Sequence, residues 1–240
     1  MIQCIDTLLL YTISKESEKA KQLKEISIDR EDLVLERTRL KNQVHTLLYR
    51  IYNTEYEQKF KDPFSLKALR FWRKAKPKCD PYLLKTMKRK IRRLLDIHVE
   101  VTDLEKDMIT LLDAGEYTIQ TASGCGVVLA STIIGEIGDI NRFTSPGALS
   151  KYAGCSPKER SSGKKTRHVK NRSGNRRLNC AFHRMALSQI SRMGNDRART
   201  YFKRKISEGK SKSQALVCLR RQMVNIIWMM LKHKTIYRDA

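Results

Sequence analysis

The stretch that decides the fold runs from Leu23 to Ile51 and reads LKEISIDREDLVLERTRLKNQVHTLLYRI. Its apolar residues recur at seven-residue spacing along two seams, at Ile26, Leu33, Leu40 and Leu47 and at Leu23, Val44 and Ile51. No proline or glycine occurs between Met1 and Lys61, so residues 16–60 are predicted to form one long helix. Arg30 and Arg37 interrupt the second seam. The helix therefore pairs either with a second chain or with a later helix of its own chain.

Outward from this stretch, apolar residues at helical spacing predict a short helix over 64–76 and a second long helix over 81–115. The second long helix is expected to return against the first. Its first half carries six basic residues: Lys85, Lys88, Arg89, Lys90, Arg92 and Arg93. They form either a solvated face or a stripe that follows a nucleic-acid backbone. Four acids of the first helix are expected to pair within that helix: Asp29, Glu31, Asp32 and Glu36.

From residue 116 onward glycines separate shorter helices, among them 178–193 and 213–232. The predicted fold class is all-α, with a coiled-coil helical hairpin followed by a compact helical domain. We expect a linker region over 16–115 and a C-terminal domain over 116–240.

The charge balance points to a polyanionic partner. The 240 residues hold 49 Lys and Arg against 25 Asp and Glu, a net charge of +24. A surplus of this size bears on partners and indicates nucleic acid first. No apolar run has the length of a membrane helix, and the N-terminus lacks the marks of a signal peptide. The six scattered cysteines have no metal or disulfide spacing, which indicates reduced thiols in the cytoplasm.

Two glycines one residue apart, Gly124 and Gly126, precede an apolar helical stretch that begins at Val127. Such a turn brings backbone amides and a helix N-terminus toward a phosphate, as in a helix-hairpin-helix motif that grips DNA without reading its sequence. A tight turn with no ligand explains the same residues equally well.

The segment 156–177 reads as a basic loop with a single acid, Glu159. Its basic residues are Lys158, Arg160, Lys164, Lys165, Arg167, Lys170, Arg172, Arg176 and Arg177. Charges packed this closely repel one another without an anion, so phosphate contact is the preferred interpretation and a solvated loop the alternative. Gly163 and Gly174 permit close backbone approach, and Asn175 joins this DNA-binding set.

Within this loop stand Ser161 and Ser162, followed by Gly163. A serine hydroxyl becomes a good nucleophile when a base or a positive field assists it, and the flanking Arg and Lys provide such a field for a phosphoryl transition state. A serine before a glycine is more often part of a turn. Neither the acids of the first helix nor Asp139 form a convincing metal site, so no metal ligand is predicted.

Five pieces resemble the C-terminal domain of the IS one-ten (IS110) family of insertion-sequence transposases. They are Gly124–Gly126, Glu136–Phe143, Tyr152–Pro157, Ser162–Lys164 and Gly174–Leu178, in that order. The segment Arg30–His45 resembles the family's linking coiled coil, so the resemblance covers roughly residues 17–235.

The resemblance implies DNA transposition by recombination, with a serine that attacks a DNA strand and holds it covalently. That serine is Ser162 here, with the adjacent Ser161 as the alternative. The family also implies an N-terminal RuvC-like nuclease domain with acidic ligands for Mg²⁺, an element-encoded guide RNA, a homo-oligomer and a nucleoid-associated, cytoplasmic place in a prokaryote. No cofactor is expected in this chain.

Two departures qualify this resemblance. The nuclease domain is expected to be nearly absent, with residues 1–15 as its remnant: Asp6 stands for one acid, and Gln3 replaces another. Lys170-Asn171-Arg172 replaces the family's Ile-Ser-Lys. The leading hypothesis is therefore a truncated transposase. The alternatives are a non-catalytic relic or regulator that associates with a full-length transposase and, more weakly, an RNA-binding scaffold.

Overall fold

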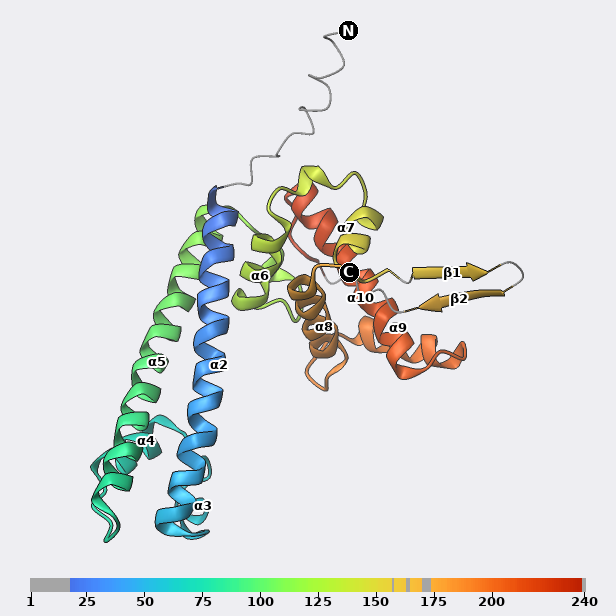
Figure 1. The fold of residues 1–240 in the computed structure, drawn as a ribbon. Helices are drawn as coiled ribbons and strands as arrows, with labels where there is room; N and C mark the ends of the chain where they lie inside the picture. Colours follow the sequence, from blue (N-terminus) through green and yellow to red (C-terminus); the bar gives the residue numbers. More distant parts are fainter. Residues whose placement is uncertain (1–17, 157, 163–164, 170–173, 239–240) are drawn as a thin grey trace. The chain divides into compact units, whose positions relative to one another are not determined.

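The computed structural model describes residues 18–156, 158–162, 165–169 and 174–238, and for 158–162 and 165–169 it describes the backbone alone (Figure 1). The helices are α2 (Glu18–Tyr52), α3 (Glu55–Lys59), α4 (Leu66–Lys74), α5 (Pro81–Ala114), α6 (Val127–Ile137), α7 (Pro146–Tyr152), α8 (Arg176–Ile190), α9 (Asp196–Ser207) and α10 (Lys212–His233). Two short 3-10 helices, η1 (Ile119–Thr121) and η2 (Ile140–Arg142), flank α6. Helices dominate the described chain, and the predicted all-α class is confirmed.

The chain divides into two compact units. The first, here called the hairpin unit, consists of residues 28–107. The second, here called the C-terminal unit, joins the described part of α2 up to Ser27 to the described residues from Met108 onward. The boundary differs from the predicted one because the first turns of α2 and the end of α5 belong to the core of the C-terminal unit, through residues such as Leu23 and Leu112.

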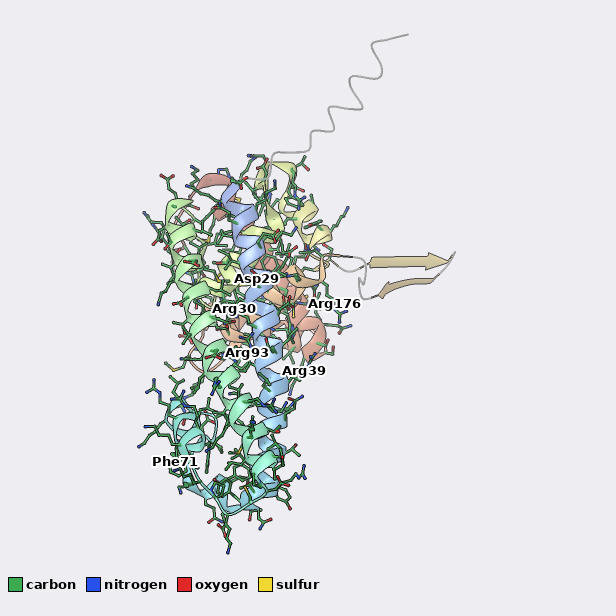
Figure 2. The ribbon with its side chains drawn as sticks, turned by 60° about the vertical axis from the view of Figure 1, so that its left-hand side comes forward. Asp29, Arg30, Arg39, Phe71, Arg93 and Arg176 are labelled. Carbon is green, nitrogen blue, oxygen red and sulfur yellow. The ribbon has the colours of Figure 1, made fainter. Side chains whose placement is uncertain are left out.

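In the hairpin unit, α2 and α5 run antiparallel. Arg30 pairs with Glu105 at 2.6 Å, Glu36 with Arg93 at 2.8 Å and Gln43 with Lys90 at 2.7 Å, so positions rise along one helix as they fall along the other. Figure 2 shows Arg30 and Arg93 along these two helices. Arg30, one of the two arginines that interrupt the predicted seam, thus has a carboxylate partner on α5. The expectation that Glu36 pairs within its own helix is wrong, because Arg93 reaches it from α5.

The end of the hairpin unit that contains the connection between α2 and α5, here called the tip (residues 40–95), has a core of its own. Trp72 of α4 and Tyr56 of α3 are almost fully buried beside Leu48 and Ile91. The indole of Trp72 donates to the carbonyl of Pro63 at 3.1 Å, which satisfies its one polar group. Ser65 caps α4 by accepting from the Ala68 amide. The short helix predicted over 64–76 is confirmed as α4.

The C-terminal unit is organised around α10, which packs against α7, α8 and α9, while α6 packs against α8. The side chains of Phe182 and Ile227 are fully buried in this core. The indole of Trp228 on α10 donates to the carbonyl of Phe143 at 3.2 Å. This packing fixes the ends of α6, α7 and α8 relative to one another, and the candidate site lies at those ends.

The segment predicted as a basic loop contains a β-hairpin. β1 (Lys158–Ser162) pairs with β2 (Lys165–Val169) antiparallel, from Lys158 opposite Val169 to Ser162 opposite Lys165. Only two residues separate the strands in sequence, and a glycine at the first of them favours a two-residue hairpin connection. The prediction missed this element because charge density, rather than residue alternation, dominated the reading of the segment.

Candidate functional site

The turn at Gly124 is held against α8. The amide of Cys125 donates to the carbonyl of Ala122 at 2.9 Å, and Gly124 has φ +76°, as the third residue of a type II turn requires. A Cβ on Gly124 would lie 3.0 Å from the Cβ of Ser188, and the side chain of Gln189 donates to the carbonyl of Ser123. The turn geometry and the close contact with α8 therefore explain a glycine at position 124 without any ligand.

Gly126 differs from Gly124 in being exposed. It is the N-cap of α6, and a Cβ added to it would meet no atom within 4 Å. The element before the turn is the three-residue η1, which is shorter than the first helix of a helix-hairpin-helix motif. Phosphate contact at this turn remains a prediction, and Gly126 is the better placed of the two glycines to make it.

A buried carboxylate, Glu136 near the end of α6, is the centre of the site. Its side chain is only 7% exposed. Oε2 accepts from the side-chain nitrogen Nδ2 of Asn175 at 2.6 Å, and Oε1 lies 3.2 Å from Nε of Arg177. Because an isolated buried charge is costly, these partners are what make the carboxylate tolerable at this position. Glu136 thus ties the end of α6 to the start of α8.

The main chain of the same residue has two further partners. The carbonyl of Glu136 accepts from Nη2 of Arg142 at 3.3 Å and from the hydroxyl of Tyr152 at 3.4 Å. The guanidinium of Arg142 also lies 4.7 Å from the ring centres of both Phe143 and Tyr152, within the range of a cation–π contact. Tyr152 at the end of α7 is therefore fixed by α6 and by the segment after it.

The chain segments on either side of the β-hairpin meet beside this carboxylate. The backbone amide of Asn175 donates to the backbone carbonyl of Tyr152 at 2.7 Å. A Cβ on Gly174 would lie 2.3 Å from the backbone nitrogen of Gly154, so only glycine permits the approach. Asn175 also caps α8, because its Oδ1 accepts from the amide of Leu178 at 2.9 Å.

A second anchor uses Asn179 and Arg220. The Asn179 amide nitrogen donates to the carbonyls of Ala153 and Gly154, both at 2.9 Å. Its oxygen accepts from Nη1 of Arg220 at 2.9 Å. Arg220 on α10 is only 8% exposed. Because its guanidinium can only donate, the Asn179 atom that faces it is the side-chain oxygen. Burial raises the pKa of the neighbouring Cys155 thiol to about 11, while Arg220 lowers it, so the thiol is protonated at neutral pH.

Together these contacts form the hairpin base, a name used below for Glu136, Tyr152, Gly154, Gly174, Asn175, Arg177, Asn179 and Arg220. In sequence, Gly154 precedes the β-hairpin and Gly174 follows it. In the strand register Lys158 and Val169 are the pair nearest to it in sequence, and Ser162 and Lys165 are the pair farthest from it. The backbone of Ser162 therefore lies at the end of β1 that is farthest in sequence from this base.

Apart from Gly124 and Gly126, the predicted catalytic and DNA-binding residues fall into three groups. The backbones of Lys158, Arg160, Ser161, Ser162, Lys165 and Arg167 lie in the two strands. Lys164, Lys170 and Arg172 lie outside the described residues, as do Gly163 and the expected nuclease remnant over residues 1–15. Asn175 and Arg177 bind Glu136, whereas Arg176, the first residue of α8, is exposed (Figure 2).

Several residues of the base were not among the predicted site residues, chiefly Glu136, Asn179 and Arg220. Glu136 had a usable signal: it is the one charged residue of the otherwise apolar α6, and an acid in such a stretch requires a cationic or amide partner. Asn179 and Arg220 had no such signal, because they lie 41 positions apart and meet only through the packing of α8 and α10.

Within the described residues no group of three or more His, Cys, Asp or Glu side chains is arranged to hold a metal ion. The five cysteines in that part of the chain are free. Burial raises the pKa of Cys125 to about 12, which makes this thiol a poor nucleophile. Nor does any described helix combine the length and apolar character that a membrane span requires.

The C-terminal unit combines a helical core with a basic β-hairpin, and comparison with known proteins finds a similarity to transposases. Residues 116–203 match the model of the Transposase IS116/IS110/IS902 family. This region, which contains the hairpin base up to Asn179, is similar to that family, in agreement with the resemblance found in the sequence.

Three curated proteins of insertion elements are similar to the chain. The insertion element IS116 uncharacterized 44.8 kDa protein of Streptomyces clavuligerus is 31% identical over 147 residues, 61% of this chain and 36% of the relative. The IS110 uncharacterized 43.6 kDa protein of Streptomyces coelicolor is 34% identical over 151 residues, again 61% and 36%. The IS900 uncharacterized 42 kDa protein of Mycobacterium paratuberculosis is 35% identical over 124 residues, 51% and 31%. The match spans about a third of the length of these relatives.

Proposed function

We propose that the C-terminal unit binds DNA and presents the Ser162 hydroxyl for strand cleavage and rejoining during DNA transposition. The observation that carries this proposal is the convergence of separate family-like segments at the hairpin base. Glu136, Tyr152–Cys155 and Gly174–Arg177 come from different helices and meet within hydrogen-bonding distance, and the last two flank in sequence the β-hairpin that contains Ser162. A rigid support of this kind is what a positioned nucleophile requires.

The proposed step is a phosphoryl transfer. The Ser162 oxygen forms a bond to the phosphorus of a backbone phosphate, and the bond from phosphorus to one flanking sugar oxygen breaks. The serine loses its proton, and the departing sugar oxygen gains one, so the step needs no electron donor or acceptor. Rejoining is the reverse: a sugar hydroxyl attacks the phosphoserine ester and releases Ser162.

Charge supports this chemistry. Residues 158–177 contain nine Lys and Arg and a single acid, Glu159. Positive side chains near the scissile phosphate stabilise the charge that develops in the transition state, and they also give the sequence-independent affinity for DNA backbone that precedes it. Arg176 is exposed at the start of α8, and we propose that it contacts the phosphate next to the hairpin base.

The metal-dependent half of the reaction is assigned to the RuvC-like nuclease domain that the family resemblance implies. Its acidic residues would hold Mg²⁺ and activate the phosphate. The proposal therefore has two parts, a serine from this chain and acids from that domain. We further propose that the active assembly contains more than one protein chain and uses an element-encoded RNA to choose its sites.

The test is a denaturing gel that detects DNA covalently bound to protein. The full chain is incubated with labelled element-end DNA, the element RNA and Mg²⁺, with and without a separately supplied RuvC-like domain of a longer relative. We expect a slow band that needs this domain, disappears in Ser162→Ala and persists in Ser161→Ala. A band that persists in both single variants and in the double variant would overturn the assignment.

The same experiment separates the second candidate function, a non-catalytic DNA-binding protein that regulates a full-length transposase. The observation in its favour is that the described residues contain no cluster of metal-binding acids. This candidate predicts DNA binding of equal strength in wild type and Ser162→Ala, with no covalent band under any condition.

A further inference from the structure

The tip of the hairpin unit carries a concentration of positive charge that the proposed DNA chemistry does not use. Between Lys59 and Arg92 there are thirteen Lys and Arg and two acids, a net charge of +11 in 34 residues. Both acids are engaged with backbone amides. Asp62 accepts from Phe64 at 2.8 Å, and Asp80 accepts from Tyr82 at 2.6 Å and from Leu83 at 3.1 Å.

The thirteen basic side chains of residues 59–92 are not neutralised by acids of the described chain. In the described part of the chain, no carboxylate lies within ion-pair distance of any of these thirteen residues. Two have other contacts: Lys90 donates to Gln43 at 2.7 Å, and Lys59 lies 4.2 Å from the ring centre of Phe71. Arg93, one position beyond the segment, shows the contrast, because it binds Glu36 and Glu100.

Four exposed residues of α5 form one stripe. Tyr82, Lys85, Arg89 and Arg92 follow one another at spacings of three and four, so they share a face of the helix. Met87, Ile91 and Leu94 on the opposite face are buried in the core of the tip. Like charges at such spacings destabilise a helix, and a bound polyanion would remove this repulsion.

The stripe ends in an aromatic ring that faces solvent. Tyr82 is 80% exposed and lies in the first turn of α5, next to the basic segment that contains Lys76 and Lys78. On α4, Phe71 is 38% exposed beside the exposed Arg70 and Lys74, and Figure 2 shows it at the tip. Aromatic rings beside a positive groove are how proteins hold unpaired bases, since each base has a face that can stack.

A membrane surface fits these residues less well than a nucleic acid. A membrane-bound helix needs a free apolar face. The apolar face of α4, formed by Ala68, Leu69 and Trp72, is instead buried inside the tip. The exposed residues of α4 are basic apart from Leu66 and Phe71.

We infer that the tip is a second nucleic-acid site, which holds an unpaired strand with its phosphates along Lys85, Arg89 and Arg92 and a base stacked on Tyr82. The inference extends the proposed function, since it gives a transposase-family chain a strand-binding surface separate from the hairpin with Ser162. An RNA and a single-stranded DNA present the same phosphates and bases, so the two sources are compared directly.

The experiment measures binding of the full chain to a labelled strand by fluorescence anisotropy. The probes are RNA and DNA single strands of one sequence and the corresponding DNA duplex. The triple variant Lys85→Gln/Arg89→Gln/Arg92→Gln is expected to bind single strands about tenfold or more weakly and to lower the salt slope by about 2. Tyr82→Ala is expected to lose about tenfold on single strands and little on duplex, and Tyr82→Phe to retain the affinity.

A matched control removes one Lys and two Arg from exposed positions of the other unit: Arg197→Gln/Lys203→Gln/Arg221→Gln. Equal losses in the two triple variants would mean bulk attraction by a basic chain and would overturn the inference. An unchanged affinity of Tyr82→Ala for single strands would also overturn it. So would a triple variant that binds single strands normally and loses affinity only for vesicles of anionic lipid, measured in parallel. Circular dichroism verifies that each variant is folded.

The outcome is distinguishable from that of the proposed chemistry. At saturating protein the tip variants should still form the Ser162-dependent covalent band on DNA. Ser162→Ala should lose the band and retain single-strand affinity. Failure of one result therefore leaves the other standing.

Discussion

The hairpin base and the tip use basic residues in opposite ways. At the base, Arg177 and Asn175 bind the buried carboxylate of Glu136, and Arg220 binds the side chain of Asn179. In residues 59–92 of the tip there are thirteen Lys and Arg and only two acids, and both acids accept from backbone amides. Paired cations hold chain segments in place, because a displacement of either segment would separate the cation from its partner. Unpaired cations destabilise their own unit slightly and remain free for an external anion.

The first way to break this comparison is to remove the acceptor at the base. Glu136→Ala leaves Arg177 and the Asn175 amide without their shared partner in a largely buried place. We expect a loss of about 3 kcal/mol in the free energy of unfolding, which lowers Tm by roughly 6–12 °C in a chain of this size. Thermal and urea unfolding measure it.

Glu208→Ala is the control, because Glu208 pairs with Lys205 at 2.7 Å on the surface of the same unit. Its Tm should barely change, since an exposed ion pair stabilises little. Similar shifts in the two variants would show that Glu136 is no more than another surface pair.

The second test crowds the base without touching its charges. Gly174→Ala places a methyl group 2.3 Å from the nitrogen of Gly154, so the two chain segments must separate. We expect a loss of about 2 kcal/mol in the free energy of unfolding, as for other overpacked sites, together with a weaker covalent band.

Gly147→Ala on α7 is matched to it, because the nearest atom to its added Cβ is Oγ of Ser145 at 3.6 Å. This variant should be neutral or slightly stabilised, since alanine favours a helix. If Gly174→Ala behaves in the same way, the close approach at the base has no structural importance.

How far the sequence alone leads differs between the two regions. Long periodic segments were predictable: residues 81–115 became α5 (Pro81–Ala114), and 213–232 became α10 (Lys212–His233). The charge of the tip was likewise visible, because it is local in sequence. The hairpin base was not visible as a unit, since its contacts join residues such as Glu136 and Asn175, 39 positions apart. Such pairs follow from how helices pack, and one sequence read along its length does not report that.

The site residues show the same division. The sequence singled out Asn175 and Arg177 for phosphate, whereas the structure has both bound to Glu136. Arg30 was read as a defect in a seam, and its partner Glu105 lies 75 positions away. The residue types alone indicated that these positions have a specific partner. Only the fold specified whether the partner is internal or external.

The smallest expected effect sharpens the comparison within the hairpin unit. The hydrogen bond from Arg93 lowers the pKa of Glu36, so the pair stabilises the fold at neutral pH and this stabilisation disappears as the carboxyl is protonated in acid. Glu36 is more than a third exposed, which limits the effect to under about 1 kcal/mol. Glu36→Gln should be slightly less stable than wild type at pH 7, and this difference should disappear as the pH falls below the lowered pKa of Glu36. A gap that widens in acid would contradict the sign of this linkage.

The central claim is that the anchored hairpin carries the chemistry and the tip carries binding alone. The most direct test is to digest the covalent DNA–protein species with trypsin and to identify the modified peptide by mass spectrometry. Cleavage after Arg160 and Lys164 releases residues 161–164, and fragmentation distinguishes Ser161 from Ser162. The account predicts DNA attached to Ser162. Attachment to any residue outside the hairpin would contradict it.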